Sequence, residues 1–188
     1  PAVLSALLED GVDPDARDAY GATALMYAAV ANPTPGVVAC LAAAGADVEA
    51  RSDDGLTPLM FAANSASHPE VTEALLAAGA SISSRSDRGW TPLMFAAANN
   101  HNPAVIAVLL KAGAAIDARS NDGWTALLFA SRFTASPRVV ELLLDAGADA
   151  TTTTPEGKRA LDYARDNTSL SGTATLERLR RACSAPAP

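Results

Sequence analysis

The side chains that could bind a metal or act as nucleophiles are few and widely spaced in this sequence. The two histidines, His68 and His101, are far apart along the chain, and the two cysteines, Cys40 and Cys183, lie in opposite parts of it. Zinc sites use Cys and His ligands at short, defined spacings. The Asp-Gly turns lack the spaced ligands and terminal glutamate of a calcium loop. We therefore expect no catalytic residue, no metal site and no cofactor, and we expect Cys40 to pack as a small apolar side chain.

Arginine recurs at a regular spacing that indicates recognition or stabilisation rather than catalysis. The column consists of Arg17, Arg51, Arg85 and Arg119, and Thr153 takes the fifth place. Aspartates lie close to each of these arginines, so the guanidinium groups are expected to pair with carboxylates of their own or the adjacent loop. Alternatively, they bind carboxylates on a partner protein. The two interpretations are compatible.

A second column becomes aromatic toward the middle of the chain. It consists of Ala22, Leu56, Trp90 and Trp124. Exposed tryptophan beside arginine is the composition of protein interfaces, so these side chains could anchor a partner. Alternatively, each indole lies against the neighbouring loop, under an arginine in a cation–π contact. Arg132 and Phe133 extend the same surface. The candidate partner-binding residues are Arg51, Leu56, Arg85, Trp90, Arg119, Trp124, Arg132 and Phe133.

The elements that position these side chains follow from a 34-residue internal repeat. Three columns keep this period along the chain: Gly21, Gly55, Gly89, Gly123 and Gly157; Gly11, Gly45, Gly79, Gly113 and Gly147; and Pro1, Pro35, Pro69, Pro103 and Pro137. A repeat of this size cannot bury its own apolar face, so the units must stack into a solenoid.

Each unit is predicted to hold two helices and a projecting hairpin. In the central repeat, Thr91 and Pro92 begin the first helix, because threonine caps it and proline suits its first position. Asn102 and Pro103 begin the second helix in the same way. Gly113 ends it as a left-handed cap. Polar turn residues and an Asp-Gly pair follow, which is a hairpin signal.

Apolar columns with the same period predict the core. One consists of Val3, Val37, Val71, Val105 and Val139, and another of Leu7, Leu41, Leu75, Leu109 and Leu143. A third, of Met26, Met60, Met94 and Leu128, is interpreted as packing rather than as a metal or redox device.

The run from Thr57 to Ala63 (TPLMFAA), with Ala-Gly-Ala from Ala78 to Ala80, resembles the ankyrin repeat, whose pattern is T-P-L-H-x-A with a period of about 33 residues. Here the period is 34, and the extra residue is expected in the loop between the paired helices, near residues 99–102. Met60 replaces the histidine of the pattern. The resemblance implies an α solenoid of stacked helix–loop–helix repeats with projecting β-hairpin loops. It also implies that Trp90, Trp124, Arg85 and Arg119 contact a protein target. The high alanine content and the longer period are similar to those of bacterial ankyrin proteins.

The repeat divides the chain into four parts. Residues 1–20 are predicted to be a partial repeat whose first helix is missing, and residues 21–156 four full repeats. Residues 157–183 are predicted to be a polar capping repeat, and residues 184–188 a disordered tail. Without a first-helix partner, the helix of residues 2–9 would expose leucines and favour weak self-association.

Composition excludes two classes of partner. The net charge of −7 argues against nucleic acid, which requires a basic surface. No apolar run approaches the roughly 20 residues of a membrane helix, so membrane insertion is not expected. We therefore expect a non-catalytic protein-interaction module that binds a protein or peptide through a concave surface of hairpins and first helices. The alternative is a regulatory or targeting arm of a larger enzyme, toxin or effector.

Overall fold

The computed structural model describes residues 11–31, 34–65, 68–99 and 102–184, and these residues form an α solenoid. Two kinds of helix alternate along the chain. The first helices of the repeats are α2 (Ala24–Ala31), α4 (Pro58–Asn64), α6 (Pro92–Asn99), α8 (Ala126–Phe133) and α10 (Ala160–Asp166). The second helices are α3 (Pro35–Ala43), α5 (Pro69–Ala77), α7 (Pro103–Lys111), α9 (Pro137–Asp145) and α11 (Ala174–Ser184).

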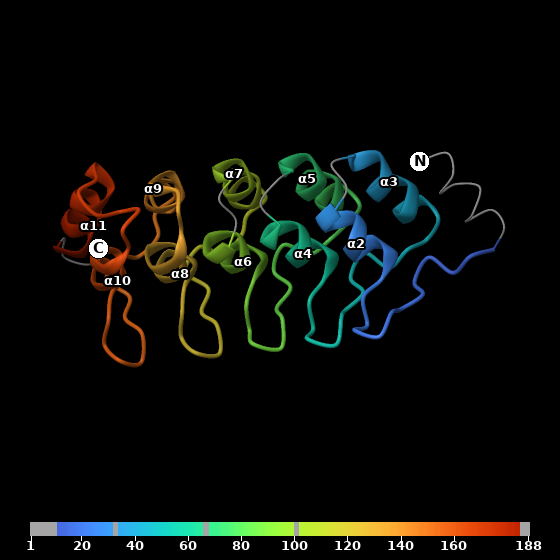
Figure 1. Cartoon of the computed structure of the whole chain (residues 1–188), viewed down its shortest axis with the longest axis horizontal. Coiled ribbons are helices and arrows are strands. Elements are labelled where there is room, and N and C mark those ends of the chain that lie inside the picture. The colour runs from blue at the N-terminus through green and yellow to red at the C-terminus, as the bar shows by residue number, and fades with distance from the viewer. Residues whose placement is uncertain (1–10, 32–33, 66–67, 100–101, 185–188) are drawn as a thin grey trace.

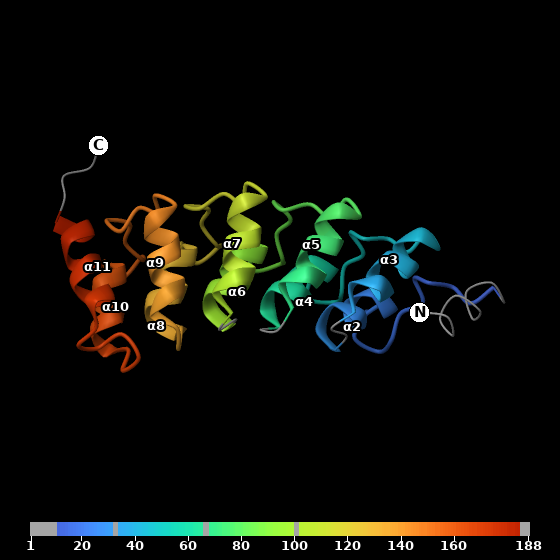
Figure 2. The same cartoon turned by 90° about the horizontal axis from the view of Figure 1, so that it is seen from above.

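The helices form two parallel rows, and the loops project from one edge (Figure 1). Each first helix lies beside the first helix of the next repeat, and each second helix beside the next second helix. The view from above shows the pairs stacked one after another along the long axis (Figure 2). This is the stacked helix–loop–helix architecture that the repeat period predicts.

Local sequence begins the helices as expected. Proline occupies the first turn of α3, α4, α5, α7 and α9. The side chain of Asn102 accepts a hydrogen bond from Ala104 N at the start of α7, 3.0 Å long. At the start of α6, Met94 N donates to Thr91 Oγ1 over 3.4 Å, which confirms the predicted cap.

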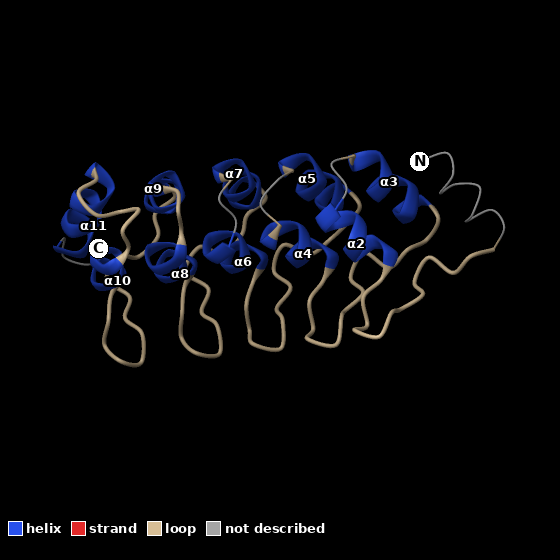
Figure 3. Ribbon diagram, viewed as in Figure 1, coloured by secondary structure: helices blue, strands red, loops and turns tan. Residues whose placement is uncertain are grey.

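The projecting loops are turns rather than strand-paired hairpins. In the loop between α3 and α4, Gly55 N donates to Ser52 O over 2.8 Å, and Ser52 N donates to Leu56 O over 3.0 Å. The one β-bridge among the described residues joins Thr153 and Arg159, and Figure 3 accordingly shows helices and loops. The expected β-hairpins lack regular strands because, at the tips, backbone groups pair with the adjacent loop instead.

The loops also pack closely. Gly55 has a φ of 73°, and a Cβ at this position would lie 3.0 Å from the backbone N of Asp87 in the next loop. Only glycine adopts this left-handed backbone conformation easily and also leaves room for the backbone of the next loop to come so close. Gly21, Gly55 and Gly89 therefore shape their turns and also let the next loop pack closely.

The predicted core columns are confirmed within the described residues. The leucine column is at most 2% exposed at every described member: Leu41, Leu75, Leu109 and Leu143. Val71, Val105 and Val139 are buried, and Val37 is partly buried. The methionine column is also buried, consistent with packing: Met26, Met60, Met94 and Leu128.

The two ends are described in part. Residues 1–10 lie outside the described residues, and so does the predicted self-associating helix. At the other end, α10 and α11 cover the predicted capping repeat, with Leu179 buried and Arg180 exposed. Helix α11 extends to Ser184, one residue into the predicted tail, and residues 185–188 lie outside the description. Of the loop predicted to hold the extra residue, positions 100–101 are likewise outside it.

We expect Leu109→Ala to lower the free energy of unfolding by about 2–5 kcal/mol, because it leaves a cavity between α7 and its neighbours. The neighbouring Leu110→Ala provides a matched control, since Leu110 is only partly buried and should lose clearly less. Urea denaturation followed by circular dichroism measures both. Equal losses for the two variants would contradict the assigned register.

Candidate functional site

The predicted arginine column forms a ladder of hydrogen bonds between successive loops. Arg17 donates to Arg51 O, Arg51 Nη2 donates to Arg85 O over 2.9 Å, and Arg85 donates to Arg119 O. Arg119 Nη1 completes the ladder by donating to Thr153 O over 3.3 Å. We call Arg17, Arg51, Arg85 and Arg119 the arginine ladder. Each member therefore ties its own loop to the next one.

The expected pairing of these arginines with loop carboxylates is wrong. Within the described residues the ion pairs involve the last helices, such as Arg178 with Asp145 and Arg138 with Glu141. None of them includes a member of the arginine ladder. A backbone carbonyl lies nearer because the loops stack in register, so the acceptor recurs once in every repeat.

Backbone groups at the loop tips strengthen this connection. Asp53 N donates to Tyr20 O over 3.1 Å, and Asn121 N donates to Arg88 O over 3.1 Å. Asp47 N also donates to Asp15 Oδ1 of the preceding loop, over 2.9 Å. Main-chain amides at the loop tips thus hold successive loops together, in addition to side chains such as those of Asp15 and the arginine ladder.

The two tryptophans pack against aromatic rings of the first helices. The ring centroid of Trp90 lies 4.2 Å from that of Phe129 and 5.0 Å from that of Phe95. The Trp124 ring lies 5.1 Å from Phe129 and 4.8 Å from Tyr163. Both indoles are half-buried. Each therefore contributes to packing and still presents part of its ring to solvent.

Arg132 and Phe133 extend this aromatic cluster at the end of α8. The guanidinium carbon of Arg132 lies 5.5 Å from the Trp124 centroid and 5.4 Å from the Tyr163 centroid. The expected cation–π contact thus exists, but its cation comes from a first helix rather than from the arginine ladder. Phe133 stacks on Trp124 at 6.4 Å and remains 49% exposed.

The structure also reveals a periodic column that our sequence interpretation missed. The column lies on the first helices and consists of Tyr27, Phe61, Phe95, Phe129 and Tyr163. We call it the aromatic column. Its members share the period of the repeat, so their spacing could have identified them.

Burial changes along the aromatic column. Tyr27 is 55% exposed in the first described repeat, whereas Phe129 is 5% exposed in the fourth. Trp90 and Trp124 cover Phe129, whereas the residue that corresponds to Trp124 for Tyr27 is the smaller Ala22. The open part of the column therefore lies toward the N-terminal end.

Tyr27 is held in place by Asp18. The Tyr27 hydroxyl donates to Asp18 Oδ2 over 2.5 Å. This hydrogen bond, with two more from backbone N–H groups, lowers the pKa of Asp18 below its ordinary value. The same hydrogen bond and the negative charge raise the pKa of Tyr27. Asp18 is thus an ionised carboxylate beside an exposed aromatic ring at neutral pH.

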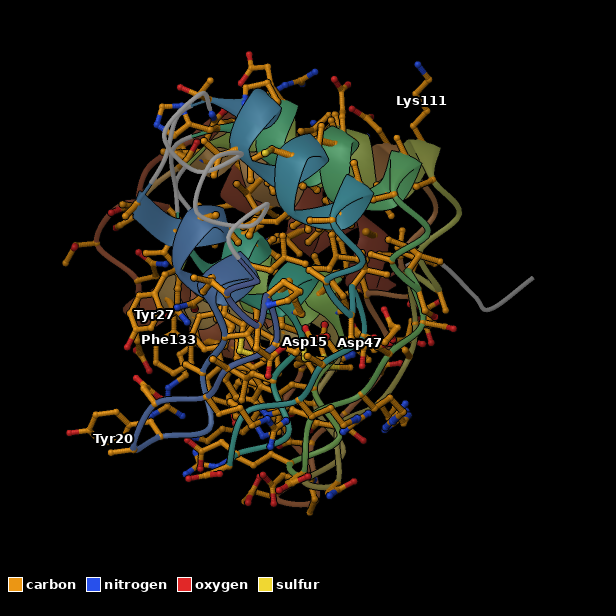
Figure 4. All side chains as sticks on the ribbon, turned by 90° about the vertical axis from the view of Figure 1, so that its right-hand side faces the viewer. Asp15, Tyr20, Tyr27, Asp47, Lys111 and Phe133 are labelled. Atoms are coloured by element: carbon orange, nitrogen blue, oxygen red, sulfur yellow. The ribbon has the colours of Figure 1, made fainter. Side chains whose placement is uncertain are left out.

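The loop tips and the first helices form one surface, which we call the first-helix face; Tyr20, Tyr27 and Val30 line one pocket on it, and Phe133 lies three repeats later. Tyr20, Tyr27, Val30 and Phe133 are exposed on it. Figure 4 shows Tyr20, Tyr27 and Phe133 on one side of the solenoid and Lys111 far from them, at the end of a second helix. Val12, which precedes the first loop, is the other large exposed apolar side chain among the described residues.

Within the described ranges, no group of three His, Cys, Asp or Glu side chains is placed to hold a metal ion. No described helix combines the length and the apolar character that crossing a membrane requires.

Comparison with known families identifies ankyrin repeats. The model for ankyrin repeats, in three copies, matches residues 1–86 and 67–154. A search of curated proteins found no match.

We expect Arg85→Ala to lower the free energy of unfolding by about 0.5–1.5 kcal/mol, the usual net contribution of a hydrogen bond. Arg88→Ala removes the same charge three residues away at a loop tip and should have a smaller effect. Urea denaturation compares the two variants. Raising the salt concentration tests the cause, because a bond to a neutral carbonyl is screened less than an ion pair. A loss that disappears in high salt would favour carboxylate pairing after all.

We expect Trp124→Ala to lower the free energy of unfolding by about 1–3 kcal/mol, somewhat less than for a fully buried aromatic ring. The physical reason is the lost contact with Phe129 and Tyr163. Tyr20→Ala, which removes a ring that is 75% exposed, serves as the control. Thermal melts measure both, and an unchanged melting temperature for Trp124→Ala would contradict the packing role.

Proposed function

Because the chain belongs to the ankyrin repeat family, we propose that it is a non-catalytic module that binds a protein or peptide partner through its first-helix face. Ankyrin repeats are generally protein-interaction modules, and their fold is typically non-catalytic. The observation that carries the proposal is the exposure of Tyr20, Tyr27, Val30 and Phe133 on this one face. Contiguous apolar surface marks interaction sites, and Tyr20, Tyr27 and Val30 line one pocket together.

Within this face we assign direct contacts to the half-buried and exposed side chains. They are Leu56, Trp90, Trp124, Arg132 and Phe133 from the sequence analysis, together with Tyr20, Tyr27, Val30 and Phe61 from the structure. Rigid aromatic rings lose little conformational freedom on binding, which suits them to this role. Main-chain hydrogen bonds between the loops support the assignment, because they hold the rings in fixed positions before a partner arrives.

Arg51, Arg85 and Arg119 have two roles in this proposal. Each donates to a backbone carbonyl of the following loop, so each one positions the loop tips. Each also remains exposed. A guanidinium group has five N–H donors, so the same side chain can bind a partner carboxylate with donors that the loop does not use.

The test is affinity capture from a native lysate with matched variants, followed by mass spectrometry and by titration of the purified partner. We expect the wild-type chain to capture a specific protein that Phe133→Ala and Tyr20→Ala bind at least tenfold more weakly, a loss of about 1.4 kcal/mol. Lys111→Ala is the control, because this side chain lies far from the first-helix face (Figure 4).

The proposal would be refuted if Phe133→Ala and Tyr20→Ala kept the wild-type affinity while Lys111→Ala lost affinity. The partner would then bind the second helices. The melting temperatures of Tyr20→Ala and Lys111→Ala should stay close to that of the wild type, because both side chains are exposed, and Phe133→Ala should lower it slightly by removing the stacking on Trp124.

A further inference from the structure

Two pockets in the N-terminal half of the first-helix face occupy equivalent places in consecutive repeats. The first has a volume of about 370 Å³, and Tyr20, Ala22, Ser52, Leu56 and Phe61 are among the residues that line it. The second has a volume of about 340 Å³, and Asp54, Leu56, Ser86, Trp90 and Phe95 are among its lining residues. Each of these five residues of the second pocket lies one full repeat after its counterpart in the first. The pockets are therefore one structural feature that occurs in two consecutive repeats.

The next place in this series is filled by side chains of the protein itself. Trp90 and Phe129 lie 4.2 Å apart between ring centroids, and Trp124 lies 5.1 Å from Phe129. From the column of Trp124, the first pocket takes Ala22 and Leu56 and the second takes Leu56 and Trp90, whereas the third place holds both tryptophans. The series of open pockets therefore ends where both residues from this column are tryptophan.

The charge around the two pockets is negative. Asp54 lines both of them, and Asp87 lines the second, where Arg88 is the basic lining residue. Asp18, ionised and bonded to Tyr27, lies beside the first pocket. More generally, residues 1–89 contain twelve acidic and four basic side chains, whereas residues 90–188 contain nine acidic and ten basic ones. An occupant of the two pockets thus meets apolar rings and a carboxylate between them.

The spacing of the pockets restricts the conformation of the occupant. Packed helices lie about 8–10 Å apart, which sets the distance between equivalent points of adjacent repeats. A polyproline II segment has three residues per turn and a rise of about 3.1 Å per residue, so side chains i and i+3 share a face about 9.3 Å apart. These two distances agree. Side chains i and i+2 of a β-strand lie only about 6.6 Å apart and do not fit.

From these observations we infer that the two pockets bind an extended basic segment of a partner protein. Two apolar side chains, three residues apart, enter the two pockets, and a Lys or Arg between them pairs with Asp54. This inference rests on the proposed function, because it names the partner chemistry for the N-terminal part of the same face. The C-terminal aromatic cluster contributes contacts outside this segment.

The direct test uses capped synthetic peptides titrated against the full chain by isothermal calorimetry. The probe contains the core Leu-Pro-Lys-Leu, in which proline favours the required extended conformation. One control peptide has Glu in place of Lys, and a second has its two leucines two residues apart. We expect each control to bind at least tenfold more weakly than the probe, and we expect the affinity of the probe to fall as salt is added.

Variants of the protein assign the binding to the pockets. Asp54→Lys should reverse the preference, so that the Glu peptide binds better than the Lys peptide. Asp122→Lys is the matched control, because Asp122 is the equivalent loop residue two repeats later, and it should leave the preference unchanged. Leu56→Trp, which gives the second pocket the pair of tryptophans found at Trp90 and Trp124, should fill that pocket and weaken the probe at least tenfold without unfolding the chain.

Several outcomes would overturn the inference. They are equal affinity for the Lys and Glu peptides, an effect of Asp122→Lys as large as that of Asp54→Lys, and no binding of the probe at millimolar concentration. Concentration-dependent dimerisation abolished by Leu56→Trp would instead identify a second copy of this chain as the occupant. A captured partner that depends on Phe133 but not on Asp54 or Leu56 would leave the proposed function intact while refuting this inference.

Discussion

Every feature of this protein depends on one constraint: a 34-residue unit of two short helices cannot bury its apolar side chains by itself. Leu75 and Leu109 are fully buried only because the helices of neighbouring repeats cover them. The hydrophobic effect is proportional to the apolar area removed from water, so stacking is the main source of stability. It also forces equivalent residues of successive repeats into columns. The arginine ladder, the aromatic column and the paired pockets all follow from this alignment.

The loops show how the alignment is extended beyond the core. Tip amides such as Asp53 N donate to the preceding loop, and the guanidinium groups of the arginine ladder donate to the following one. Most of these acceptors are backbone carbonyls, which are present whatever side chain occupies the position. Side chains at the tips can therefore differ between repeats without loss of the stack, as Tyr20, Asp54 and Arg88 do. The face combines a fixed backbone with variable chemistry, and a binding surface requires both.

The aromatic column illustrates how one position acquires different roles along the chain. Phe129 and Tyr163 are buried under Trp90, Trp124 and Arg132, and they hold the C-terminal repeats together. Tyr27 has only Ala22 and Leu56 near it in the adjoining column, and its ring stays open to solvent. The same periodic residue thus stabilises one half of the face and leaves pockets in the other half. A difference in side-chain size at the neighbouring column produces this change.

The sequence alone determined the repeat, the helices, the buried columns and the surface on which function is proposed, because period and capping residues are local signals. It also identified Arg85 and Trp90 as notable, but it could not determine what they contact. The acceptor of Arg85 is a backbone carbonyl, which has no sequence signature, and the expected carboxylate partner was wrong for that reason. The exposure of Tyr27 and the burial of Phe129 depend on which side chains lie against each ring. Only the tertiary structure decides these points, because they arise from contacts between residues that lie a full repeat apart.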